Sequence, residues 1–190
     1  MKGMNIKLEE IPCPLCETFG GIPIHQEGSF QMVRCSCCRF IYLNPRPTNE
    51  SLFQFYQHYL PEDGLSIESW QKMMQPVFKR AASLIERYKP RLPVGREKGK
   101  LLDVGAGFGF FLSEIKRKGW EVTGVEISQK AMDYAKNILG LIVHRGPLER
   151  ISFPENHFDV ITGFYVIEHL SNPMAFLREC RRILKAGGFL

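Results

Sequence analysis

The chain is 190 residues long, which is enough for one ordinary domain and a small additional module. Hydrophobic residues make up 44% of it and its formal net charge is +5, so general disorder is excluded and a nucleic-acid partner is not required. No apolar run is long enough to cross a bilayer, and residues 1–10 lack an apolar signal core. We therefore expect a cytoplasmic protein without a membrane partner.

Two C-x2-C pairs, Cys13 with Cys16 and Cys35 with Cys38, are separated by 18 residues. Disulfides are rare in the cytoplasm, whereas zinc binds four thiolates in a tetrahedron, and pairs at this spacing are typical of structural zinc sites. A segment of about 40 residues also lacks an adequate core without a metal. We predict structural Zn²⁺ on these cysteines. Cys37 could replace Cys38, and free or redox-active thiols are the alternative.

A small ribbon is predicted around the cysteines, over residues 1–45. Short strands are expected at residues 30–35 and 39–43, on either side of the second cysteine pair. The two prolines within residues 44–47 then exclude a helix or a central strand, so the ribbon ends there.

A helical linker or lid is predicted over residues 46–98. One amphipathic helix is expected at residues 50–59, after a capping threonine, and a longer one at residues 67–88. Pro76 lies inside the longer segment, so a kink or a break is expected there.

From residue 99 to residue 190, apolar segments predicted as strands alternate with segments predicted as helices. The strands are expected at 100–104, 121–126, 141–144 and 158–165, and the helices at 110–118, 128–139 and 173–184. Gly187 and Gly188 are expected to end the last helix. Alternation of this kind predicts an α/β fold with a doubly wound parallel sheet.

The first of these strands runs into a loop with three glycines at alternate positions. The segment reads Asp103-Val-Gly105-Ala106-Gly107-Phe-Gly109, and the next strand ends at Glu126, 21 residues after Gly105. Glycines at such a turn let the backbone approach a ligand closely, and an acid at that strand end can accept both hydroxyls of a ribose. A dinucleotide would need a small residue where this chain has Phe110, so a dinucleotide site is disfavoured. A glycine-rich turn without a ligand is a second alternative.

These motifs resemble those of the class I S-adenosylmethionine-dependent methyltransferase family. The likeness runs over residues 99–190 and includes residues 158–161 of the fourth strand and residues 184–188 before the fifth. It implies a Rossmann-like fold with S-adenosyl-L-methionine as cofactor. The residues that it assigns to cofactor binding are Asp103, Gly105, Ala106, Gly107, Gly109, Glu126, Ile127, Leu148 and Phe164.

The cysteine ribbon extends this resemblance. Residues 35–47, which read C-x-x-C-x-x-x-Y-x-N-P-R-P, are similar to the front of zinc-ribbon methyltransferases that act on sugars and small molecules. This implies a polar small-molecule acceptor, such as a nucleotide-sugar or a biosynthetic intermediate. Residues 72–100 carry nine Lys and Arg against two Glu, so an RNA or protein methyltransferase is the alternative. A non-catalytic fragment that binds zinc and cofactor is the third hypothesis.

Glu168 and His169 follow the predicted fourth strand, where catalytic groups would face the transferred methyl group. They match an E-H signature of the resembled family, whose histidine serves in some members as the base that takes a proton from the acceptor. The alternative is that this pair only holds the loop or the helix that follows. Tyr56 and Tyr59 are expected either to cover the site as a lid or to pack within their helix.

Seven strands are typical of the resembled family, and this sequence reaches only the start of the fifth. The expected sheet is therefore incomplete, with strand order 3-2-1-4 and a stub of strand 5. The apolar strand at residues 158–165 would then be an exposed edge, and such edges favour self-association. A homodimer through that edge is expected if the native chain ends at residue 190.

Overall fold

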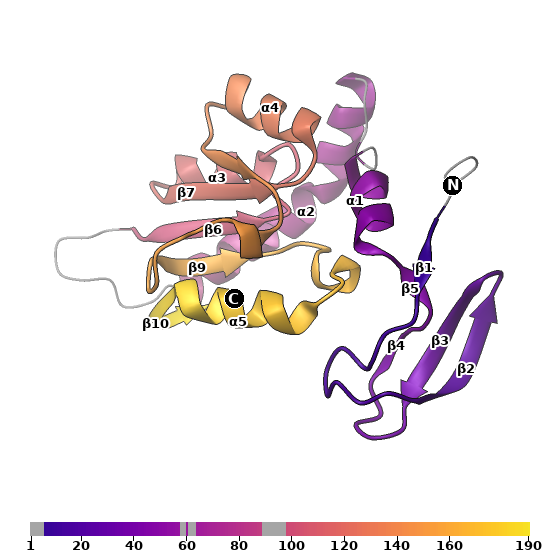
Figure 1. The fold of residues 1–190 in the computed structure, drawn as a ribbon. Coiled ribbons are helices and arrows are strands. Elements are labelled where there is room, and N and C mark those ends of the chain that lie inside the picture. The colour runs from indigo at the N-terminus through magenta and orange to yellow at the C-terminus, as the bar shows by residue number, and fades with distance from the viewer. Residues whose placement is uncertain (1–5, 58–59, 61–63, 89–97) are drawn as a thin grey trace.

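The computed structural model of the protein describes residues 6–57, 60, 64–88 and 98–190. A small antiparallel ribbon lies to one side of a larger parallel sheet that has helices on both faces (Figure 1). Helix α1 (Asn49–Gln57) follows the ribbon and lies between it and the helices of the larger sheet (Figure 1). None of the described helices combines the length and the apolar character that a membrane span requires.

Five strands form the parallel sheet: β6 (Lys100–Val104), β7 (Glu121–Glu126), β8 (Val143–Arg145), β9 (Phe158–Thr162) and β10 (Leu184–Phe189). Their order is β10-β9-β6-β7-β8, and all neighbouring strands are parallel. Counted along the chain, this order is 5-4-1-2-3, with the first strand in the centre. The structure thus confirms the predicted doubly wound α/β fold.

The predicted apolar edge at residues 158–165 is not an edge in the structure, because β9 is flanked by β6 on one side and by β10 on the other. Leu184 of β10 pairs with Phe158, and Phe189 pairs with Val160, with a register shift between these two pairs. The fifth strand is therefore a full strand of six residues and not a stub. The structure therefore contradicts the exposed β9 edge, and the oligomeric state remains a prediction.

The last helix also ends differently from the prediction. α5 spans Pro173–Ile183, and Leu184 leaves it with extended backbone angles and begins β10. Gly187 and Gly188, which were expected to end the helix, lie inside this strand. Gly187 has a φ of 78°, a left-handed conformation that interrupts regular pairing and accounts for the register shift.

Five helices cover the sheet: α2 (Gly64–Tyr88), α3 (Phe110–Arg117), α4 (Gln129–Asn137), the 3-10 helix η1 (Leu148–Arg150) and α5. α2, α3 and α4 contribute to one core cluster with Leu101, whereas α5 and η1 contribute to a second cluster with Leu102. Neighbouring residues of a strand point to opposite faces. The two clusters therefore lie on opposite faces of the sheet, which is buried on both sides.

Helix α2 continues through Pro76, where the sequence predicts a kink or a break. Pro76 is exposed, whereas Met74, Phe78 and Ala82 are buried at helical spacing against the sheet. Proline cannot donate a backbone hydrogen bond, and the packing of the apolar face compensates for that loss.

The ribbon is a three-stranded antiparallel sheet in the order β2-β3-β4. Its strands are β2 (Gly21–Glu27), β3 (Phe30–Cys35) and β4 (Ile41–Leu43), and a separate pair joins β1 (Leu8–Glu9) to β5 (Arg46–Pro47). The sequence pattern does not predict β2, because it contains Pro23. Proline is tolerated there because β2 is an edge strand with a register shift next to Pro23.

Candidate metal centre and cofactor site

The two predicted cysteine pairs come together in the ribbon. The Sγ atoms of Cys13 and Cys38 are 3.6 Å apart, as are those of Cys16 and Cys35, and all four lie within 4.8 Å of one another. Thiolates at about 2.3 Å from one tetrahedral zinc ion would be about 3.8 Å apart, whereas a disulfide needs about 2.05 Å. The donor set therefore fits a four-thiolate zinc site. Cys37 is exposed and lies outside this cluster.

Both cysteine pairs lie on the same kind of turn. The backbone N–H of Glu17 donates to the carbonyl oxygen of Cys13, and that of Arg39 donates to the carbonyl oxygen of Cys35. Glu17 and Arg39 each follow the second cysteine of their pair, and both have positive φ values, 58° and 66°. Two equivalent turns thus present the sulfur atoms.

The glycine loop after β6 uses its backbone donors within the protein. The N–H groups of Gly105 and Ala106 donate to the carbonyl oxygen of Val125 at 2.9 and 3.0 Å. The N–H group of Gly107 donates to Oε2 of Glu126 at 2.7 Å. Gly105 and Gly107 have φ values of 70° and 53°, which favour glycine. These bonds hold the loop at the carboxyl ends of β6 and β7, the edge of an open α/β sheet where ligands bind.

This hydrogen bonding argues against a dinucleotide ligand. A pyrophosphate binds at such a loop through free backbone N–H groups near the start of the following helix. The first three loop donors already have acceptors, and the N–H group of Gly109 donates to the carbonyl oxygen of Ala106 at 2.9 Å. These four N–H groups of the loop are therefore not available to a pyrophosphate.

Glu126 holds the loop through both of its carboxylate oxygens. Oε1 accepts hydrogen bonds from the N–H groups of Ile127 and Ser128, each at 2.8 Å, and Oε2 accepts the bond from Gly107. The side chain is buried, and burial raises the pKa of Glu126 although the three N–H groups act in the opposite direction. Oε2 accepts one bond from the described residues and retains a lone pair for a ribose hydroxyl.

Asp103 lies within the sheet and is 2% exposed. Its Oδ1 accepts a hydrogen bond from Oγ1 of Thr162 at 2.7 Å, which links β6 to β9. Burial raises the pKa of Asp103 to about 7, while the Thr162 bond lowers it and the charge of Glu126 raises it further. Asp103 thus joins two strands directly before the glycine loop, and the cofactor role assigned to it remains a prediction.

Three other predicted cofactor residues have packing contacts. A Cβ atom added to Gly109 would lie 2.6 Å from Cδ1 of Leu141, so glycine permits close packing here. Leu148 is fully buried in the cluster that contains α5, and the rings of Phe164 and Phe111 are 4.8 Å apart. The cofactor contacts assigned to these residues remain predictions.

The predicted catalytic pair lies in the 3-10 helix η2 (Ile167–His169), where the side chains of Glu168 and His169 are both exposed. The hydroxyl oxygen of Tyr56 lies 2.7 Å from Nδ1 of His169, and the two ring centroids are 5.1 Å apart. Helix α1 thus contacts the loop after β9, although the two residues are 113 positions apart. Tyr56 and Tyr59 are expected either to cover the site or to pack within their helix; Tyr56 makes this contact, and Tyr59 lies outside the described residues.

The loop between β9 and α5 is also anchored against the glycine loop, a contact that no motif predicts. A Cβ atom added to Gly105 would lie 2.7 Å from Cγ2 of Val166, so the glycine allows Val166 to pack there. Phe164, two residues earlier, packs against the core cluster that contains α2 and α3. Tyr165 between them is 64% exposed and has a φ of 55°. Its two neighbours are thus directed inward and Tyr165 outward.

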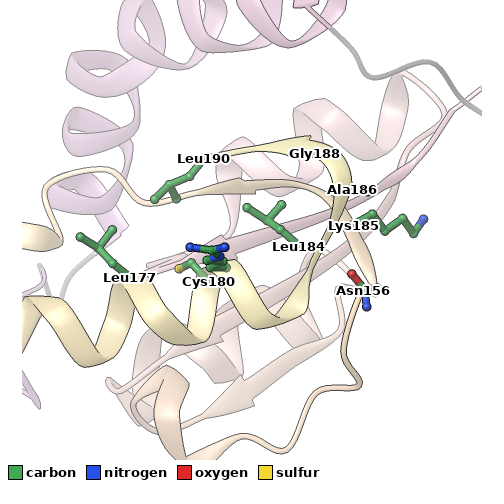
Figure 2. Close-up of a pocket in the computed structure, with 9 residues that line it drawn as sticks. Asn156, Leu177, Cys180, Leu184, Lys185, Ala186, Gly188 and Leu190 are labelled. Atoms are coloured by element: carbon green, nitrogen blue, oxygen red, sulfur yellow. The ribbon is translucent and has the colours of Figure 1, made fainter.

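A cavity of about 410 Å³ lies elsewhere, between α5 and β10 (Figure 2). Leu177 and Cys180 of α5 line it together with Leu184 of β10 and Leu190. Lys185 and Asn156 lie at its other end (Figure 2). None of the predicted zinc, cofactor or catalytic residues lines this cavity.

Comparison with known proteins matches residues 102–190 to the family described as methyltransferase domain. Ubiquinone biosynthesis O-methyltransferases of Cereibacter sphaeroides and Coxiella burnetii are 31% and 33% identical to this chain over 103 and 99 residues. These matches cover 52% and 49% of this chain and 42% of each relative, so the chain spans less than half the length of these relatives.

A solved structure from Thermotoga maritima gives a similar result for the fold. It is described as a SAM-dependent methyltransferase, possible histamine N-methyltransferase, and is 23% identical to this chain with a TM-score of 0.53. The match covers 72% of this chain and 58% of that one. Sheet order, glycine loop and these likenesses define a Rossmann-like fold. Residues 102–190, slightly less than half of the chain, are similar to methyltransferase domains.

Proposed function

We propose that this protein transfers a methyl group from S-adenosyl-L-methionine to a polar small molecule, such as a nucleotide-sugar or another biosynthetic intermediate. The bond between the Gly107 N–H group and the Glu126 carboxylate carries the proposal. It belongs to a loop in which the N–H groups of Gly105, Ala106 and Gly107 already have acceptors, beside a carboxylate oxygen with a lone pair for a ribose hydroxyl. When bound, the cofactor supplies an activated methyl group, so the protein mainly provides position and electrostatics.

The residues proposed to hold the cofactor surround this loop. Glu126 would accept the ribose hydroxyls, and Gly105 and Gly107 would allow close approach of the backbone. Ile127 and Leu148 would lie against the adenine, and Phe164, Ala106, Gly109 and Asp103 would shape or support the remaining pocket.

Zinc on Cys13, Cys16, Cys35 and Cys38 is proposed as structural. Four thiolates fill a tetrahedral zinc ion, so no position remains open for a water molecule or a substrate. The ion would stabilise the ribbon and would take no part in proton or methyl transfer.

His169 is proposed as the base that takes a proton from the acceptor. With Nδ1–H donating to the hydroxyl oxygen of Tyr56, Nε2 retains its lone pair and can accept the proton. The proton would leave an acceptor hydroxyl as that oxygen forms its bond to the methyl carbon. Glu168, the residue directly before His169, is proposed as the second member of this catalytic pair.

Two observations favour a small-molecule acceptor over RNA. The relatives from Cereibacter sphaeroides and Coxiella burnetii are named as O-methyltransferases of ubiquinone biosynthesis, which supports a small acceptor and an oxygen nucleophile. In the basic stretch at residues 72–100, Lys98 pairs with Glu86 at 2.7 Å and Lys100 pairs with Glu121 at 3.1 Å. These pairs reduce the positive charge available to a phosphate backbone.

Calorimetric titration with S-adenosylhomocysteine, the reaction product, tests the cofactor site. We expect micromolar binding to the zinc-loaded protein and a loss of roughly tenfold or more in affinity in Glu126→Ala. Glu121→Ala, which removes an exposed carboxylate at the start of the same strand, serves as the control and should bind normally. Thermal melts of each variant show whether it folds.

Absence of binding by a folded, zinc-loaded protein would contradict the proposed function and would favour a non-catalytic role. Normal affinity in folded Glu126→Ala would remove Glu126 from the site. RNA binding that weakens steeply as the salt concentration rises, as expected when several phosphate charges are neutralised, would favour the RNA alternative.

A further inference from the structure

Arg46 connects the ribbon to the loop that carries His169. The side chain of Arg46 is 18% exposed, and its Nε and one terminal nitrogen donate to Oε1 of Glu9 at 3.1 and 3.0 Å. The other terminal nitrogen donates to the carbonyl oxygen of Ser171, 125 residues further along the chain. One guanidinium group thus binds two segments that are remote in sequence.

The ribbon determines where this guanidinium group lies. Arg46 stands between Pro45 and Pro47, whose rings restrict the backbone, and it is the cross-strand partner of Glu9 in the β1–β5 pair. The Asn44 side chain accepts a hydrogen bond from the N–H group of Ile11 at 2.9 Å. Ile11 is two residues before the first zinc-site cysteine, and Asn44 directly follows β4 of the ribbon.

Ser171 marks the exit of the loop between β9 and α5. It lies two residues after His169 and directly before Asn172, whose side chain caps α5 by accepting from the N–H group of Ala175 at 2.9 Å. The start of the loop is fixed by Val166 against the glycine loop. The Arg46 contact therefore fixes the other end, and His169 lies between the two anchored points.

We infer that Arg46 is a positioning residue that holds the His169 loop in place and transmits the fold of the four-cysteine ribbon to it. This inference rests on the proposed function, in which His169 receives a proton. Arg46 itself touches neither cofactor nor acceptor in this assignment. It acts through the backbone of Ser171, which keeps the His169 ring beside Tyr56.

Hydrogen exchange and NMR of the cofactor-free, zinc-loaded protein test the inference without an acceptor. In Arg46→Ala we expect the backbone amides of residues 166–172 to exchange roughly tenfold faster or more, because a charge-assisted hydrogen bond is lost. The ¹⁵N signals of the His169 ring should move from one hydrogen-bonded tautomer to an average of both. Arg34→Ala, which removes another arginine of the ribbon, should change neither the amide exchange of the loop nor the His169 ring signals.

Zinc removal adds a test of the coupling. Chelation should accelerate exchange of the same loop in the wild-type protein but add little in Arg46→Ala, because the connection is already broken. Equal acceleration by chelation in both proteins would mean that the ribbon acts on the loop by another route. If Arg46→Ala does not fold, Arg46→Lys and Glu9→Gln replace it. Smaller increases in loop exchange and smaller shifts of the His169 signals are then expected.

Unchanged loop exchange and unchanged His169 signals in folded Arg46→Ala would overturn the inference. The S-adenosylhomocysteine titration is read separately on the same samples. If the wild-type protein binds S-adenosylhomocysteine and loop exchange is unchanged in Arg46→Ala, the inference is wrong but the proposed function is supported. If the wild-type protein does not bind and loop exchange is faster in Arg46→Ala, the proposed function is wrong but Arg46 still anchors the loop.

Discussion

The ribbon and the α/β part of the chain are stabilised in different ways. Among the described residues, the buried core of the ribbon has four members, and two of them, Cys13 and Cys35, belong to the cysteine cluster. The α/β part has sixteen buried residues in the cluster on one face of its sheet and nine in the other. Apolar burial can stabilise the α/β part, whereas the ribbon has too little of it, which favours the proposed metal on its cysteines.

The face of the ribbon sheet opposite the cysteine cluster also contributes little apolar burial. Ile22 and Ile41 both pair with Arg34 of the central strand, and Leu43 lies two residues further along β4 on the same face. These three apolar side chains are 59%, 45% and 41% exposed. Exposed apolar side chains contribute little to folding. The stability of the ribbon therefore depends on its other face, where the sulfur atoms lie.

Removal of zinc is expected to give the largest effect. Chelation should abolish amide protection in β2, β3 and β4 and leave protection in β6 and β7 close to that of the zinc-loaded protein. Structural zinc sites contribute about 10–16 kcal/mol in small domains, more than the ribbon core can replace. Hydrogen exchange of peptides from the two parts measures both effects in one sample.

Single cysteine substitutions provide the matched control for this prediction. Cys35→Ser should reproduce the effect of chelation, because Cys35 is buried within the cluster. Cys37→Ser should bind zinc as the wild-type protein does, because Cys37 is exposed outside it. If the ribbon keeps its amide protection without metal, its stability does not depend on zinc, and the proposed difference between the ribbon and the α/β part is wrong.

Gly109→Ala is expected to destabilise the α/β part by roughly 3–5 kcal/mol and to leave zinc binding unchanged. Gly109 has a φ of 79°, and an added Cβ would lie 2.6 Å from Leu141, so backbone strain and overpacking combine. Gly140→Ala isolates the first effect, because Gly140 has a φ of 61° and nothing within 4 Å of an added Cβ. It should cost about 1–2 kcal/mol in the same denaturant titration.

Equal losses in the two glycine variants would show that packing at Gly109 is unimportant. The pair also sharpens the meaning of the glycine motif. The sequence pattern assigns all three glycines to the cofactor, whereas the structure gives Gly109 a packing reason of its own. A stability loss in Gly109→Ala without a matching loss of S-adenosylhomocysteine affinity would separate the two explanations.

The sequence predicts most of the α/β part because its signals are local. Apolar strands alternate with capped helices, and Ser128 and Asn172 cap α4 and α5 through hydrogen bonds to Ala131 and Ala175. The cysteine spacing likewise predicts the cluster that the structure forms. In each case the residues that determine the feature lie close together in the chain.

The features that the sequence does not predict depend on contacts between remote segments. β10 forms because β9 offers it an edge, although Gly187 and Gly188 are typical of a helix end. Arg46 belongs to the N-P-R-P segment of the sequence motif, but the motif gives it no role, which appears only when Ser171 lies beside it. Pro76 remains in a helix because α2 packs on the sheet, so part of the predicted linker belongs to the α/β core.

An effect smaller than that of Gly109→Ala concerns the pH dependence of the α/β part, through Asp103. Its pKa is about 7 in the folded protein, against about 3.9 in an unfolded chain, because the carboxyl is buried. Between these values the folded state binds the proton more tightly, so the stabilising effect of the proton is lost as pH rises through 7. From pH 5 to pH 8 the free energy of unfolding should fall by about 2–3 kcal/mol more in the wild-type protein than in Asp103→Asn.

Urea titrations at several pH values measure this difference, and Thr162→Val tests its cause. The hydroxyl of Thr162 donates to Asp103 at 2.7 Å and favours the charged carboxylate, so its removal should raise the pKa of Asp103 further. Thr162→Val should therefore lose stability more steeply than the wild-type protein as pH rises. Parallel pH curves for all three proteins would mean that Asp103 is charged in the folded sheet at pH 5. The sheet would then hold a buried carboxylate rather than a neutral acid at the residue two positions before Gly105.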